Sequence, residues 1–145
     1  MNYKILLLDD DSDDRMFFKD AIKKVGNGDV SCITLADGHE LIATLQGEPD
    51  SKPHIIFLDI NMPGMSGWEV LSLLKEHEDY ANIPAIMYST SKHNDEIRKA
   101  KALGALYFFN KPSDFGVLKE TLKVVIEHLR SNNIHQLSHA SNLFI

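Results

Sequence analysis

The segment from residue 55 to residue 67 constrains the fold more than any other part of the chain. Four apolar residues, Ile55 to Leu58, run directly into Asp59 and then into a turn rich in Pro and Gly. A run that is apolar on both faces is typical of a central parallel strand whose sheet is covered by helices. Pro63 lacks the N–H needed to continue a strand, and the glycines after it permit a sharp reversal into a helix. Because ligands of open α/β sheets bind outside the carboxyl ends of strands, Asp59 is predicted to lie where such folds do chemistry.

Apolar runs alternate with stretches of helical periodicity along the chain. We expect strands at residues 4–8, 30–35, 55–59, 85–88 and 105–109, and helices at residues 12–25, 39–45, 68–78, 94–103 and 114–129. The first helix is predicted to be capped by Ser12 or Asp13. Strands that alternate with helices favour a parallel sheet with helices on both faces, because each crossover connection is right-handed. The predicted fold class is therefore α/β, with a doubly wound, five-stranded parallel sheet.

Length and charge narrow the classes of function. A chain of 145 residues is long enough for one domain with its own core, and a single cysteine, Cys32, allows no internal disulfide. The formal charge of −6 argues against nucleic acid as a partner, because phosphate binding needs a basic surface. The chain shows neither a signal peptide nor an apolar run long enough to span a membrane, so we expect a cytoplasmic protein with no membrane partner.

The composition changes near residue 130. Residues 131–139 are mostly polar, so we expect a globular domain at 1–130 and a mobile tail at 131–145, with residues 143–145 as an apolar end that can dock. Residues 47–53 are expected to form a surface loop. No second domain is expected after residue 130, and with it no DNA-binding output domain.

Polar residues follow four of the predicted strands. Their positions are Asp9, Asp10, Asp59, Ser89 and Lys111. Three crowded carboxylates repel one another and attract a hard divalent cation such as Mg²⁺, which prefers oxygen ligands. A cation and a lysine together would neutralise a phosphoryl group, and a carboxylate beside them can attack phosphorus to form an aspartyl phosphate. We assign this role to Asp59, because the turn after it leaves its outer face open.

These motifs resemble the receiver domain of two-component response regulators, the CheY-like superfamily. The resemblance rests on residues 8–10, 58–67, 88–90 and 108–112 and covers about residues 3–130. It implies a flavodoxin-like sheet with the strand order 2-1-3-4-5. It also implies a bacterial phosphorelay switch, not an enzyme, in which a sensor histidine kinase or a histidine phosphotransfer protein donates a phosphoryl group to Asp59.

The resemblance also implies roles for individual residues at the site. Asp10 and Asp59 would bind Mg²⁺ by their side chains, Asn61 by its backbone carbonyl, and Asp9 through a water molecule. Lys111 would pair with the phosphoryl oxygens, and its bond to Pro112 is expected to be cis.

A second group of residues would carry the signal. Ser89 would move towards the phosphoryl group, and Phe108 would turn and report this movement to the surface formed by residues 94–103, 105–109 and 114–129. A homodimer through that surface is an expectation from the same resemblance. Thr90 stands where the family usually has Ala or Gly, and its branched side chain is expected to narrow access to the site.

Several other interpretations compete with a phosphorylation switch. Taken singly, Ser89 would be a helix cap and Phe108 would be core packing. A phosphatase that used the same intermediate would need a second acid two residues after the nucleophile, and that position holds Asn61. A phosphorylation-independent interaction module is the remaining alternative, although the complete set of acidic and basic site residues argues against it.

Overall fold

The computed structural model describes residues 2–47, 52–90 and 93–139, and the expectations for residues 48–51 and 143–145 lie outside this part. Strands and helices alternate as predicted: β1 (Tyr3–Leu8), α1 (Ser12–Val25), β2 (Val30–Leu35), α2 (Gly38–Leu45), β3 (Ile55–Asp59), α3 (Gly67–Glu76), β4 (Ala85–Ser89), α4 (Asn94–Ala102), β5 (Tyr107–Asn110) and α5 (Phe115–Arg130). The five strands form one parallel sheet in the order β2-β1-β3-β4-β5. The predicted α/β fold and its strand order are confirmed, and the element bounds lie within two residues of the predicted ones.

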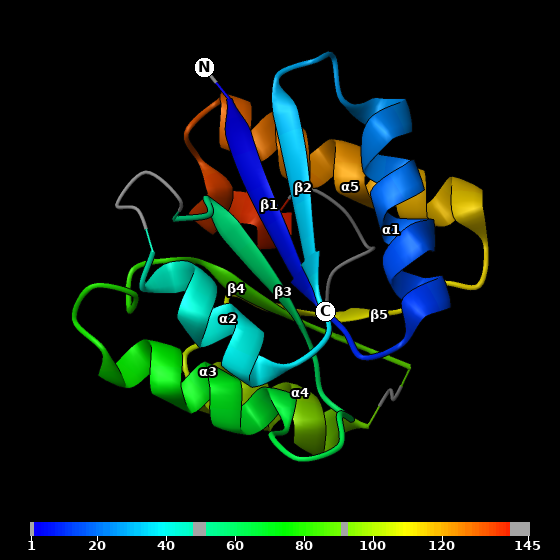
Figure 1. Cartoon of the computed structure of the whole chain (residues 1–145). Coiled ribbons are helices and arrows are strands. Elements are labelled where there is room, and N and C mark those ends of the chain that lie inside the picture. Colours follow the sequence, from blue (N-terminus) through cyan, green and yellow to red (C-terminus); the bar gives the residue numbers. More distant parts are fainter. Residues whose placement is uncertain (1, 48–51, 91–92, 140–145) are drawn as a thin grey trace.

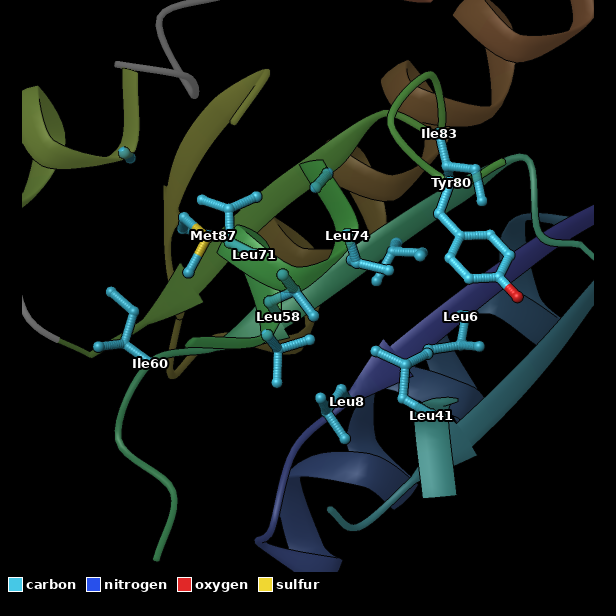
Figure 2. Packing of buried hydrophobic residues seen from close by; sticks show 14 of the residues in the cluster. Leu6, Leu8, Leu41, Leu58, Ile60, Leu71, Leu74, Tyr80, Ile83 and Met87 are labelled. Carbon is cyan, nitrogen blue, oxygen red and sulfur yellow. The ribbon is translucent and has the colours of Figure 1, made fainter. Parts of the chain in front are cut away.

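Two hydrophobic layers cover the sheet, one on each face. Helices α2, α3 and α4 cover one face of the sheet, and α1 and α5 cover the other (Figure 1). Alternate residues of one strand enter opposite layers: Leu6 and Leu8 of β1 face the first group of helices, whereas Ile5 and Leu7 face the second. Figure 2 shows the first layer, where Leu41 of α2 lies beside the leucines of β1. All of β3 is buried, as expected for a central strand with helices on both sides (Figure 1).

The cap of the first helix lies one residue before the predicted position. Asp11, in extended backbone geometry, is the N-cap, and its side chain accepts a hydrogen bond from the N–H of Asp14 at 3.0 Å. The prediction of Ser12 or Asp13 as the cap was wrong because both residues lie within the helix. Asp11 therefore satisfies one of the N–H groups that the first turn leaves without a helical partner.

The chain continues beyond α5 as a packed segment. Asn132 adopts a left-handed conformation (φ 55°) that ends α5, and a 3₁₀ helix, η2 (Ile134–His139), follows it. Leu137 is fully buried in the layer that α1 and α5 cover, and Ile134 packs against the same layer. Ile134 and Leu137 are therefore part of the packed body, where the polar composition predicted a mobile tail. None of the described helices is both long enough and apolar enough to cross a membrane.

Candidate functional site

The carboxyl ends of β1, β3 and β4 bring three polar residues to one edge of the sheet. Leu8 pairs in register with Leu58, so Asp9 and Asp59 follow these residues at the same level. Ser89 is the last residue of β4, the neighbouring strand on the other side. All three are buried, with Asp9 and Ser89 fully inaccessible. The predicted convergence of these strand ends is therefore present in the structure.

Asp9, Asp10 and Asp59 form a compact acidic cluster. One carboxylate oxygen from each lies within 4.8 Å of the other two, and Asp10 is the exposed member. Burial, followed by the charge of Asp9, raises the pKa of Asp59 to about 7, although Lys111 acts in the opposite direction. Crowded carboxylates of this kind are suitable ligands for a hard divalent cation, so the residues fit Mg²⁺ or Mn²⁺.

Backbone contacts hold Asp9 in place. Its Oδ1 accepts a hydrogen bond from the N–H of Asp11 at 3.0 Å, and its carbonyl oxygen accepts one from Arg15 Nη1 at 2.8 Å. Its own N–H donates to the carbonyl of Leu35 at 3.0 Å. The chain between β1 and α1 thereby fixes Asp9 while its Oδ2 remains directed at Lys111.

Lys111 supplies the positive charge of the site. Its Nζ lies 2.8 Å from Asp9 Oδ2, 2.9 Å from Asp14 Oδ2 and 3.6 Å from Asp59 Oδ1. Only 10% of its side chain is exposed. Burial acts to lower the pKa of Lys111, but the interactions with Asp9, Asp14 and Asp59 outweigh it and the pKa is raised. The lysine is therefore charged and already oriented towards the carboxylates.

The bond between Lys111 and Pro112 differs from expectation, because none of the described peptide bonds is cis. Trans is the form that an X-Pro bond favours by about 0.5–1 kcal/mol when its surroundings do not select the other. The N–H of Lys111 donates to the carbonyl of Ser89 at 2.8 Å, so this backbone contact exists with the trans bond.

Two glycines shape the turn between β3 and α3. Gly64 has a φ of 80°, a region that favours glycine, and Gly67 approaches the end of β3 so closely that an added Cβ would lie 2.1 Å from the carbonyl oxygen of Asp59. Asn61, at the start of this turn, is exposed. The turn thus depends on glycine to bring α3 against the strand that carries Asp59.

The two residues expected to carry the signal occupy different environments. Ser89 lies at the carboxyl end of β4. Phe108 is buried beside Met87 in the layer that α4 covers, with 1% of its surface exposed. Phe108 is therefore a core residue in this structure. Thr90 follows Ser89 and is exposed.

Asp14 is a site residue that the sequence analysis missed. An acid in the first turn of a helix commonly does no more than favour the helix dipole, but the carboxylate of Asp14 accepts a hydrogen bond from Lys111 Nζ at 2.9 Å. The two residues are 97 positions apart, and no local pattern indicates their contact. Its place in the first turn of α1, four residues after the acidic pair, is the one feature that could have drawn attention to it.

The fold and the acidic site define a flavodoxin-like α/β protein with a cluster of carboxylates and a lysine at the carboxyl edge of its sheet. The response regulator receiver domain family matches this chain over residues 5–123. The chain belongs to this family of two-component signalling domains, in which phosphorylation of an aspartate is general. The family suggested by the sequence motifs is confirmed.

Relatives and solved structures agree with this assignment. The chain is 31% identical to sporulation initiation phosphotransferase F of Bacillus subtilis over 132 residues, which span 91% of this chain and 99% of that protein. The phosphorylated cyanobacterial phytochrome response regulator RcpA superposes with a TM-score of 0.80 at 27% identity, covering 91% of this chain and 96% of the other. The Mn²⁺-bound form of response regulator Rcp1 gives a TM-score of 0.75 at 26% identity, covering 88% and 94%.

Proposed function

We propose that Asp59 is the phosphoryl acceptor of this receiver domain and that the donor is a phosphohistidine on a sensor histidine kinase or a histidine phosphotransfer protein. One observation carries the proposal: Asp59 ends the central strand with its carboxylate inside the acidic cluster and 3.6 Å from Lys111. Among the clustered carboxylates, it is the one followed by the glycine turn. Family membership supports the chemistry but does not identify the donor.

The proposed reaction is a displacement at phosphorus. A carboxylate oxygen of ionised Asp59 forms the new bond to phosphorus, the bond from phosphorus to the donor imidazole nitrogen breaks, and the imidazole leaves with that electron pair. Lys111, which is charged and held nearby, pairs with the phosphoryl oxygens as negative charge gathers on them. The site thus provides a nucleophile at the end of β3 and a positive charge just after β5, at the same edge of the sheet.

A divalent cation is part of the proposal. Asp9, Asp10 and Asp59 would hold Mg²⁺ together with the backbone carbonyl of Asn61, and Asp9 would act through a water molecule. When bound, the ion neutralises carboxylate charge and stabilises the transferring phosphoryl oxygens. Crowding among the three carboxylates supports this assignment, because Lys111 alone cannot balance their charge.

We further propose that Ser89 and Phe108 carry the signal to the surface formed by α4, β5 and α5. Ser89 ends β4, next to the strand that carries Asp59, and Phe108 packs in the layer under α4. A hydroxyl drawn towards a new dianion would leave space that a buried aromatic ring can enter. A downstream protein, or a second copy of the chain, would then recognise the altered surface.

Intact mass spectrometry after incubation with acetyl phosphate and Mg²⁺ tests the acceptor. We expect one added phosphoryl group on the wild-type chain and on D20N, which alters an exposed acid of α1, but none on D59N. An adduct that persists on D59N would refute the assignment. If neither acetyl phosphate nor a phosphohistidine donor gave an adduct while Mg²⁺ still bound, a phosphorylation-independent interaction module would replace the proposal.

A further inference from the structure

The first turn of α1 contains a carboxylate that the helix itself does not need. Asp11 is the N-cap of this helix and accepts the N–H of Asp14, so the side chain of Asp14 is not needed as the cap and has another partner. That partner is Lys111, whose Nζ donates to Asp14 Oδ2 at 2.9 Å. Asp14 thus links α1 to the segment after β5, across the site edge.

Lys111 is closer to Asp14 than to the proposed phosphoryl acceptor. Its Nζ lies 2.9 Å from Asp14 and 2.8 Å from Asp9, but 3.6 Å from Asp59. To pair with a phosphoryl group on Asp59, the ammonium group must move towards that side of the site. Such a movement lengthens at least one of its two short contacts.

Asp14 is the partner that can be released at the lower cost. Its side chain is 40% exposed, whereas that of Asp9 is fully buried and would lose a charged partner away from water. A carboxylate with access to solvent regains hydration when its ion pair opens, so the pair is of modest strength. The contact to Asp9 is therefore kept while the contact to Asp14 opens.

We propose that Asp14 is a positioning residue that holds Lys111 on the α1 side of the site and competes with the phosphoryl group for it. This inference rests on the proposed role of Asp59 as the acceptor. Removal of the Asp14 charge leaves Lys111 free to pair with a phosphoryl group, which strengthens binding at the site. Asp14 does not contact the phosphoryl group itself, and its effect passes through Lys111.

Binding of beryllium fluoride, a phosphoryl mimic, tests this competition under saturating Mg²⁺ by titration calorimetry. We expect D14N to bind the mimic about two- to fivefold more tightly than wild type, the range that a half-exposed ion pair supports. D13N removes the same charge from an exposed neighbour in the same turn and should match wild type. D14E restores the carboxylate and should return the affinity towards the wild-type value, which a purely structural effect would not do. Mg²⁺ affinity is measured separately for each chain and taken into account.

The outcomes separate this inference from the proposed function. Equal affinities for D14N and D13N, or weaker binding by D14N, would overturn the role of Asp14 while the acceptor site still stands. If the wild-type chain bound Mg²⁺ but no beryllium fluoride, both the acceptor site and the competition at it would be refuted.

Discussion

Replacement of Asp59 by Asn should stabilise the metal-free protein. Asp59 is 5% exposed and shares its surroundings with Asp9 and Asp10, so its ionised form is unfavourable in the folded state. Burial and the neighbouring charge raise the pKa of Asp59 from 3.8 to about 7. An amide of nearly the same shape removes this charge and its repulsion.

The size of the effect follows from the pKa difference. The pKa of Asp59 differs by about 3 between the folded and the unfolded protein. At a pH where Asp59 is ionised in both states this difference corresponds to about 4 kcal/mol, since each pKa unit is worth about 1.36 kcal/mol. This gain in stability is reduced because D59N loses the contact with Lys111 and because its amide group needs hydrogen-bond partners in a buried position. We expect the free energy of unfolding of D59N to exceed that of wild type by about 1–3 kcal/mol at pH 8.

The pH dependence has a definite sign. Between pH 3.8 and about 7, folded wild-type protein binds more protons at Asp59 than unfolded protein does, so its stability falls as the pH rises through this window. The stability of D59N does not fall in this way, because its residue 59 does not ionise. The stability difference should therefore be small near pH 4 and complete by pH 8.

Urea unfolding in EDTA, followed by circular dichroism at several pH values, measures this difference. D20N, an exposed change on α1, should stay within about 0.5 kcal/mol of wild type. Mg²⁺ should then stabilise wild type more than D59N, because a ligand stabilises the state that binds it. A D59N variant that is no more stable than wild type at pH 8, or a difference that does not grow with pH, would show that ionised Asp59 does not destabilise the metal-free protein.

Three further predictions concern the surroundings of the site. L137A should lower the free energy of unfolding, measured in urea, by about 2–4 kcal/mol because Leu137 is fully buried. Q136A, at an exposed neighbour, should have little effect. Equal effects of the two substitutions would argue against packing of η2. G67A should lower both the stability of the fold and the affinity for Mg²⁺, since the added Cβ would lie 2.1 Å from the carbonyl oxygen of Asp59. An unchanged Mg²⁺ affinity, measured by calorimetry, would contradict this prediction. T90A should raise the initial rate of phosphorylation by acetyl phosphate if the branched side chain restricts access, and an unchanged rate would show that it does not.

The sequence predicted those parts of the site that depend on strand ends. Apolar runs that stop at Asp9, Asp59 and Ser89 mark the carboxyl ends of buried strands, and a parallel sheet brings such ends to one edge. The alternation of apolar runs and helical periodicity was enough to locate the strands, whereas the strand order came from the resemblance to the receiver family.

The features that were missed depend on contacts between distant residues. Asp14 belongs to the site only because the segment after β5 passes beside α1, which no local pattern records. Leu137 lies in a polar stretch, and its burial depends on the turn at Asn132. The cap of α1 fell on Asp11 because several adjacent residues are all good caps, and the backbone geometry selects among them.

Chemical trapping of the phosphorylated residue tests the assignment of Asp59 as the acceptor. The wild-type chain would be phosphorylated by a phosphohistidine donor in Mg²⁺, reduced with borohydride, digested and sequenced by mass spectrometry. Reduction of an aspartyl phosphate converts that residue to homoserine, so we expect homoserine at position 59 and at no other aspartate, with none in D59N. Homoserine at Asp9, Asp10 or Asp14, or a stable phosphoryl group on a histidine of this chain, would contradict it.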